Sequence, residues 1–301
     1  MRTMHAEIVV GDSLDVMRGM ASGSVDAIVT SPPYADQRSY TPGEFGGRDA
    51  NRRARATAQR ARSAAPAEWV SWIEPYTAEM LRVLKPDGSL MLNLGVVIRD
   101  GEEHECVDDI VRQCRRQGWR LMQRMVWVKP NGQVPSHKAY LTQAHEFVFW
   151  LAPCLTPWRA YEQPAGSQAS IEVRAPHSPS SAKRIQQMYS GRCTLTSKQG
   201  RTHKPHPDGA RPTTVLTCSV GGAPNPNAHP ARMPVRMASH LVSLCCPPGG
   251  LVLDPFSGDA TTGVAAQRSG RRYLGIEINA GYARRSRQRL IDDAGLFGDV
   301  A

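Results

Sequence analysis

The sequence lacks a long apolar run, because no stretch of its 301 residues approaches the roughly 20 consecutive apolar residues that span a bilayer. Its N-terminal segment also lacks the apolar core and small-residue cleavage site of a secretory signal. The seven cysteines are odd in number and form no CxxC pair, so their spacing specifies neither a disulfide framework nor a closed zinc site. We therefore expect a cytoplasmic protein with reduced thiols, no bound metal and no membrane contact.

The chain carries an excess of positive charge. Lys and Arg together number 37 against 27 Asp and Glu, which gives a formal net charge of +10. Such a balance favours a polyanionic partner, since cationic side chains that neutralise phosphates release condensed counterions. The hydrophobic fraction of 41% is that of an ordinary globular protein, and the length suffices for one large domain, alone or with a smaller module.

Short apolar segments typical of strands alternate with segments of helical periodicity over residues 1–152. Strands are predicted in EIVVGD, VDAIVTSPPY, GSLMLNLG and HEFVFWLA, with helices near 67–84 and 103–117. Over 153–226 the residues Pro, Ser, Gly, His and Arg dominate, which predicts a loop-rich insert. Over 227–301 the alternation returns around the strands LVLD and RYLGIEI. This order predicts an α/β fold with a mostly parallel sheet.

The segment GGLVLDPFSGDATTGVAAQRSGRRYLGIEIN has the layout of a nucleoside-binding unit. Its first strand ends at Asp254 and runs into a small-residue turn at Ser257 and Gly258, and its second strand ends at Glu277, 19 residues after Gly258 (277 − 258). A carboxylate roughly 20 residues after a glycine turn can accept both ribose hydroxyls. The turn lacks the GxGxxG dinucleotide fingerprint, and Asp254 suits a cationic ligand better than a pyrophosphate, which favours S-adenosylmethionine over NAD. The alternative is the same unit without a ligand.

The loop Ser31-Pro32-Pro33-Tyr34 follows a buried strand, where α/β proteins keep their sites. Two prolines fix φ and remove two backbone donors, so Ser31 Oγ and the Pro32 carbonyl are candidate acceptors for the hydrogens of an exocyclic amino group. Tyr34 could stack on a base that has left the duplex. Because the donor methyl of S-adenosylmethionine is already activated, this chemistry needs no metal and no covalent nucleophile. The alternative is a plain strand-ending loop.

TSPPY, DPFSGDATTG and GIEIN together resemble the amino-methylating DNA methyltransferases, and their order resembles the β class of that family. The similarity extends to GDSLDV, LKPDGSLMLNLG, VWVKPNGQVP, HEFVFW and HPARMP. The resemblance implies a doubly wound, circularly permuted Rossmann-like fold. It divides the chain into a catalytic half (1–152), a target-recognition region (153–226) and an S-adenosylmethionine-binding half (227–301).

The resemblance also implies roles for single residues. Asp254, Phe256 and Gly258 would bind the methionine part of the cofactor, Glu277 the ribose and Asp12 the adenine amino group. The full predicted cofactor site is Asp12, Asp254, Phe256, Ser257, Gly258, Thr261 and Glu277. The sequence departs from the family at Ala260, which stands where the second glycine of FxGxG is usual.

The residue before Pro-Pro-Tyr bears on the base that is methylated. Family members with Ser there most often modify cytosine N4, and those with Asp adenine N6, so Ser31 predicts N4-methylcytosine with adenine N6 as the alternative. More distant alternatives are an RNA or protein-amide methyltransferase and a DNA-binding protein without activity. By family analogy the partners are double-stranded DNA, a second copy of the chain and a cognate restriction endonuclease.

Basic residues predict where DNA binds. An arginine-rich stretch lies in a loop over about 36–66 that is expected to be mobile, and further cations lie in the insert. The predicted DNA contacts are Arg52, Arg53, Arg55, Lys129, Lys183, Arg184 and Arg201. The alternative for the arginine stretch is a solvated tether. The irregular spacing of His and Cys in the insert does not predict a metal site.

Overall fold

The computed structural model describes residues 6–34, 65–99, 102–130, 141–153, 178–179, 182, 212–220 and 233–297. Almost all of the predicted basic loop and most of the predicted target-recognition region lie outside the described residues. The same holds for six of the predicted DNA contacts, namely Arg52, Arg53, Arg55, Lys183, Arg184 and Arg201.

An eight-stranded sheet forms the centre of the molecule, in the order β1-β10-β9-β2-β3-β7-β6-β8. Its strands are β1 (Ala6–Val10), β2 (Val25–Thr30), β3 (Leu84–Leu94), β6 (Trp119–Val128), β7 (His145–Pro153), β8 (Val215–Thr217), β9 (Leu251–Asp254) and β10 (Arg272–Glu277). All neighbours are parallel except β7, which runs antiparallel to both β3 and β6. The predicted mostly parallel α/β sheet is therefore confirmed.

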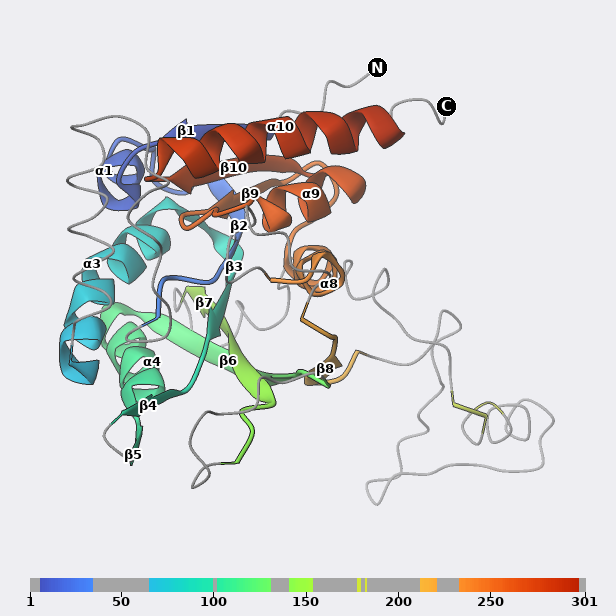
Figure 1. The fold of residues 1–301 in the computed structure, drawn as a ribbon. Helices are drawn as coiled ribbons and strands as arrows, with labels where there is room; N and C mark the ends of the chain where they lie inside the picture. The colour runs from blue at the N-terminus through green and yellow to red at the C-terminus, as the bar shows by residue number, and fades with distance from the viewer. Residues whose placement is uncertain are drawn as a thin grey trace, which may run out of the picture.

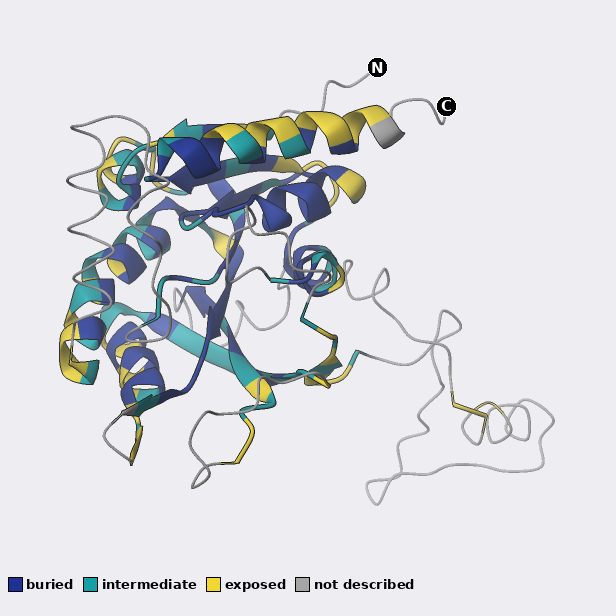
Figure 2. Cartoon of the chain, viewed as in Figure 1, coloured by how far each residue is buried: buried dark blue, intermediate teal, exposed yellow. Residues whose placement is uncertain are grey.

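Helices cover both faces of this sheet (Figure 1). One face carries α1 (Ser13–Arg18), α3 (Pro66–Val83) and α4 (Cys106–Gln117), and the other carries α8 (Val235–Cys245), α9 (Thr261–Arg268) and α10 (Ala280–Phe297). Two apolar clusters separate the sheet from the helices, one around Trp69 and Ile110 and one around Leu241 and Val264. Figure 2 shows the strands as the buried layer and the outward faces of the helices as exposed. The fold is doubly wound, as predicted.

Local signals explain where α3 and α4 begin and end. Pro66 stands in the first turn of α3, and the Glu68 carboxylate accepts the Ala65 amide at 3.1 Å, which satisfies a donor at the helix start. Gly118 ends α4 in the left-handed conformation with φ 104°. The helix predicted near 103–117 begins only at Cys106, because Glu102–His104 form strand β5, which pairs with β4 (Val97–Arg99) in a separate hairpin.

The chain crosses over between β9 and β2. From β9 it continues to β10 on one side, and from β2 it continues to β3 on the other, so the two strands border the topological switch point of the sheet. Ligands of open α/β sheets bind outside the carboxyl ends of the strands at this point. Strand β1 pairs in parallel with β10, and α10 packs on β1, so elements from both ends of the chain build this half of the sheet (Figure 1).

Strand β8 lies inside the predicted insert yet belongs to the core sheet. It pairs in parallel with β6, with Val126 opposite Val215. The Trp127 indole also donates to the Cys218 carbonyl at 2.7 Å. The last described part of the 153–226 region is therefore anchored to the sheet. Within the described ranges, no helix is long and apolar enough to cross a membrane.

Replacing Gly263 in α9 with alanine should destabilise the protein. A Cβ there would lie 2.6 Å from the Tyr273 ring and 2.9 Å from Leu290, closer than real Cβ contacts allow. We expect overpacking to lower the free energy of unfolding by about 1–3 kcal/mol despite the better helix propensity of alanine. Urea denaturation measures the change.

Gly295→Ala in α10 is the matched control, because its Cβ would meet nothing within 4 Å. This variant should gain about 0.5–1 kcal/mol from propensity alone. Equal effects of the two substitutions would contradict the tight contact between α9 and β10.

Candidate active site

The predicted catalytic loop and the predicted cofactor turn meet at the switch point. Thr30, the last residue of β2, donates from its hydroxyl to Asp254 Oδ1 at the end of β9, with a distance of 2.7 Å. Both side chains are buried. Residues that are 224 positions apart in the chain therefore form one site at the carboxyl ends of two parallel strands.

Asp254 is held by hydrogen bonds rather than by a cation. Its Oδ1 accepts the Thr30 hydroxyl and the Phe256 amide, the latter at 3.1 Å, and the Thr262 hydroxyl also bonds to the carboxylate. Burial nevertheless raises the pKa of Asp254 to about 6, because the loss of water outweighs these hydrogen bonds.

Glu277 closes the same turn. Its Oε2 accepts the Gly258 amide at 2.9 Å and its Oε1 accepts the Asn279 amide at 2.8 Å. Burial raises the pKa of Glu277 to about 7 against the effect of these two bonds. A carboxylate offers about four lone-pair sites, so two remain for further donors such as ribose hydroxyls.

The turn between Asp254 and α9 has two residues in the left-handed region. Gly258 has φ 51° and Ala260 has φ 53°. An L-residue in this conformation costs roughly 1–2 kcal/mol, so the Ala260 position, where a glycine is usual in the resembled family, is strained here. Ala260 is also fully buried. The substitution thus keeps the backbone of the turn while adding a methyl group to its packed side.

Aromatic side chains from α3 form a wall next to the turn. The Phe256 ring lies 5.9 Å from Trp72 and 5.4 Å from Tyr76, measured between ring centroids. Asp12, which caps α1 by accepting the Leu14 amide at 2.9 Å, also bonds to the Tyr76 hydroxyl, whose pKa is raised mainly by burial. Sequence reasoning missed Trp72 and Tyr76, since aromatic residues at helical spacing resemble an ordinary core stripe.

The Ser-Pro-Pro-Tyr loop is fixed from two sides. Ser31 Oγ and the Tyr34 hydroxyl are 2.9 Å apart. The Trp69 indole donates to the Pro33 carbonyl at 2.9 Å, and the Tyr34 ring meets the Trp69 ring edge-on at 6.2 Å. Helix α3 therefore holds the catalytic loop through Trp69 as well as the cofactor side through Trp72 and Tyr76.

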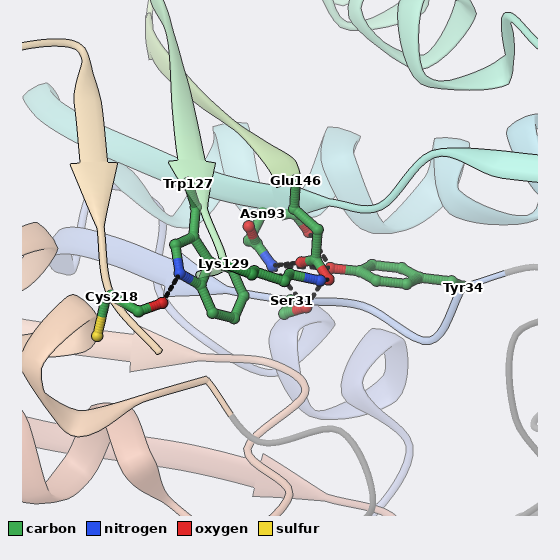
Figure 3. Close-up of polar contacts among 7 residues, drawn as sticks. All are labelled: Ser31, Tyr34, Asn93, Trp127, Lys129, Glu146 and Cys218. Carbon is green, nitrogen blue, oxygen red and sulfur yellow. Dashed lines mark hydrogen bonds and ion pairs between the residues drawn. The ribbon is translucent and has the colours of Figure 1, made fainter. Parts of the chain in front are cut away.

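A polar network that the sequence analysis did not predict surrounds Tyr34 (Figure 3). Asn93 Nδ2 donates to the Tyr34 oxygen and to Glu146 Oε2, both at 2.7 Å, and the Tyr34 hydroxyl lies 3.0 Å from Glu146 Oε2. Lys129 Nζ forms an ion pair with Glu146 Oε1. The available signal was Asn93, a polar residue inside the apolar strand LMLNL, together with Glu146 at the head of HEFVFW.

Two predicted residues have neighbours that differ from the expectation. Lys129, predicted to contact DNA, points into this network, and its side chain is only 15% exposed. Thr261, predicted to bind cofactor, has its hydroxyl 3.1 Å from Arg289, and it is Thr262 that bonds to Asp254. The structure brings the other described site residues together around the switch point. These are Asp12, Ser31, Pro32, Pro33, Tyr34, Asp254, Phe256, Ser257, Gly258 and Glu277.

The site is free of clustered metal ligands in the part of the chain that the structure describes. The N6/N4 DNA methylase family model matches residues 25–288, which is most of the chain and includes both the catalytic loop and the cofactor turn. The chain belongs to the N6/N4 DNA methylase family. It is therefore a DNA methyltransferase that uses S-adenosylmethionine, which confirms the predicted cofactor and the predicted DNA substrate.

Curated relatives cover nearly the whole chain. The type II methyltransferase M.SmaI of Serratia marcescens is 26% identical over 95% of this chain and 90% of its own length. The DNA adenine methyltransferase YhdJ of Escherichia coli (strain K12) is also 26% identical, over 94% of this chain and 82% of its own length.

Solved structures confirm the fold. The cytosine-N4-specific PvuII DNA methyltransferase aligns with a TM-score of 0.63 at 20% identity, over 97% of this chain and 92% of that one. A DNA modification methylase of Thermus thermophilus, complexed with S-adenosyl-L-methionine, aligns with a TM-score of 0.57 at 22% identity, over 96% and 95%. The family covers both amino nitrogens, so membership does not choose between cytosine N4 and adenine N6.

Trp69→Phe should slow methyl transfer. The variant keeps an aromatic ring against Tyr34 but loses the hydrogen bond that fixes the Pro33 carbonyl. We expect the single-turnover rate on DNA to fall about 10-fold, because small displacements of positioning groups are costly, while S-adenosylmethionine binding stays unchanged. Rapid-quench transfer of a labelled methyl group measures the rate.

Trp119→Phe is the matched control, since its indole donates to the Thr77 carbonyl at 3.2 Å, between α3 and β6. Both variants should lose about 1–3 kcal/mol of stability from an unsatisfied carbonyl. A rate loss as large in Trp119→Phe would show that the effect is general destabilisation.

Proposed function

We propose that the protein methylates cytosine N4 in DNA. The observation that carries the proposal is the position of the Ser31 hydroxyl, a neutral acceptor held 2.9 Å from the Tyr34 hydroxyl one residue beyond the Thr30–Asp254 contact. Ser31 occupies the place where the resemblance associates serine with cytosine and aspartate with adenine. The N4-specific PvuII enzyme, which shares the fold, is consistent with this choice.

The catalytic loop acts on the target nitrogen. An exocyclic amino nitrogen is a poor nucleophile because its lone pair is delocalised into the ring. Ser31 Oγ and the Pro32 carbonyl accept its two hydrogens and so favour the tetrahedral, attacking form of the nitrogen. Tyr34 and its neighbour Trp69 provide an aromatic surface at the loop, against which Tyr34 stacks the flipped base.

The residues of the second half fit S-adenosylmethionine. When bound, the cofactor supplies a methyl group activated on a sulfonium. Asp254 and Glu277 are buried carboxylates with raised pKa values and no cation among the groups that lower them, so a cationic ligand with hydroxyl donors suits both. We assign Asp254 to the methionine part, Glu277 to the ribose, Asp12 to the adenine amino group and Phe256 to the pocket wall, with Ser257, Gly258 and Thr261 shaping the turn.

The DNA contacts of this chain stay predictions. We propose that Arg52, Arg53, Arg55, Lys183, Arg184 and Arg201 neutralise phosphates or read the groove, with target recognition in the 153–226 region. A homodimer and a cognate restriction endonuclease likewise remain expectations from the resemblance. Family membership favours DNA over the RNA and protein alternatives and favours an active enzyme over a binding protein without activity.

The methylated nucleoside identifies the target base. Unmethylated duplex DNA is incubated with the protein and labelled S-adenosylmethionine, digested and analysed by mass spectrometry. We expect N4-methylcytosine, and a loss of at least about 100-fold in Ser31→Ala because a transition-state acceptor is removed. Ser24→Ala, whose exposed hydroxyl bonds to the Ala21 carbonyl, is the matched control and should stay active.

Adenine N6 is the second candidate, favoured by the similarity to YhdJ, a DNA adenine methyltransferase. N6-methyladenine in the digest would contradict the choice of cytosine while leaving the site intact. Full activity of Ser31→Ala would contradict the assigned catalytic loop.

Cofactor affinity should weaken as the pH falls. Ligand binding needs the ionised carboxylates, and the pKa values of about 6 for Asp254 and about 7 for Glu277 place their protonation between roughly pH 8 and 5.5. We expect the Kd for S-adenosylmethionine to rise about 10–100-fold over that range, since each pKa unit corresponds to about 1.4 kcal/mol. Isothermal titration calorimetry measures the change, and Glu277→Gln should flatten it.

The stability of the ligand-free protein should change in the opposite direction. The folded pKa values exceed the reference values of 3.8 and 4.5, so these groups contribute stability that is complete below about pH 4 and is lost as the pH rises through about 6 and 7. Parallel trends of affinity and stability with pH would contradict the assignment of both carboxylates to the cofactor.

A further inference from the structure

We propose that Glu146 is a positioning residue that sets the direction of the hydrogen bonds through Tyr34, so that Ser31 presents a lone pair to the target amino group. The proposal rests on the proposed function, because it explains how the hydroxyl of Ser31 becomes an acceptor. It assigns a role to residues of β3, β6 and β7 that lie behind the catalytic loop (Figure 3).

The carboxylate of Glu146 is the fixed end of the network. Its Oε1 is paired with Lys129, and its Oε2 receives the Asn93 amide at 2.7 Å. The side chains of Lys129 and Glu146 are only 15% and 13% exposed, so the pair is largely shielded from water. An ionised carboxylate can only accept hydrogen bonds, and the lysine beside it favours the ionised form.

The Tyr34 hydroxyl has one hydrogen and two neighbours that can only accept it. Glu146 Oε2 lies at 3.0 Å and the Asn93 carbonyl at 3.3 Å. The nearer acceptor carries the charge, so the hydrogen is directed to Glu146. With either acceptor, the Tyr34 hydrogen points away from Ser31, and the Tyr34 oxygen is left to accept from Asn93 Nδ2 and from Ser31.

The direction is passed on to Ser31. Since the Tyr34 hydrogen is engaged elsewhere, the 2.9 Å contact between the two hydroxyls has Ser31 as the donor. Asn93 Nδ2 is also 3.4 Å from Ser31 Oγ, but its two hydrogens have closer acceptors at 2.7 Å in Tyr34 and Glu146. The hydrogen of Ser31 is therefore used within the protein, and its lone pairs are available to the amino hydrogens of the base.

A glutamine at position 146 would remove this directionality. Its amide can donate to the Tyr34 oxygen, which lets the Tyr34 hydrogen turn towards Ser31 and makes the serine a donor towards the base. An amino group that meets a donor loses the polarisation that methyl transfer needs. Substitution of Glu146 should therefore slow the chemical step without weakening cofactor binding, because Glu146 is among neither the groups around Asp254 nor those around Glu277.

The test is a double-mutant cycle between Glu146 and Tyr34 in the full chain. Single-turnover methyl transfer to unmethylated duplex DNA is measured with Glu146→Gln, Tyr34→Phe and the double variant, alongside the Kd for S-adenosylmethionine. We expect Glu146→Gln to be at least about 10-fold slower with its Kd within about twofold of wild type. In the Tyr34→Phe background the same substitution should have no further effect, because the hydroxyl that it acts through is absent.

Controls separate this role from a structural one. Glu103→Gln, on the exposed β4–β5 hairpin, should leave the rate unchanged. If Glu146→Gln is destabilised by the unpaired Lys129, the variant Glu146→Gln/Lys129→Met removes both charges and should be equally slow. Recovery of the rate in that variant, additive effects in the cycle, or a wild-type rate in Glu146→Gln would each overturn the proposal.

The outcome for the proposed function is distinguishable. If wild type makes N6-methyladenine, the cycle is measured on that product, and the base choice fails while the role of Glu146 is tested in the same way. If wild type transfers no methyl group to DNA, the proposed function fails and the role of Glu146 with it.

Discussion

The contact on which the site depends is the hydrogen bond between Thr30 and Asp254 at the ends of β2 and β9. It spans the switch point, where the chain leaves two adjacent parallel strands in opposite directions. The catalytic loop begins one residue after Thr30, and the cofactor turn begins at Asp254. A donor and an acceptor of a methyl group can meet there because the sheet, rather than the order of the chain, sets the distance between them.

Helix α3 converts this shared edge into a rigid site. Its inward face packs Trp69 and Ile73 into the core, and the same turns present Trp69 to the Pro33 carbonyl and Trp72 and Tyr76 to Phe256. Packing and function are thus combined in one element. A rotation of α3 would disturb the loop that orients the base and the wall of the cofactor site together, which links the two substrates of the reaction mechanically.

The sequence was sufficient for the sheet, the loop and the acid, because each leaves a local signal. Alternating segments predicted the strands, and Ser31–Tyr34 and the spacing from Gly258 to Glu277 predicted the site. The polar network depends on strand register instead. Asn93 pairs opposite Val148 and Trp127 opposite Glu146, so Asn93 and Lys129 each lie one diagonal step from Glu146 on antiparallel neighbours. No local pattern shows which strands pair, and β8 was missed for the same reason.

The acids of the site differ in how their charge is compensated, and this difference matches the two ligands. Asp254 and Glu277 are lowered in pKa only by hydrogen bonds, and burial keeps their values raised, so their ionised forms gain most from a cation that arrives with the cofactor. Glu146 already has Lys129 as its counter-ion. A compensated acid exerts little net field on a neutral base but still dictates the direction of hydrogen bonds. The cofactor side is therefore built to attract charge, and the base side to orient a neutral amino group.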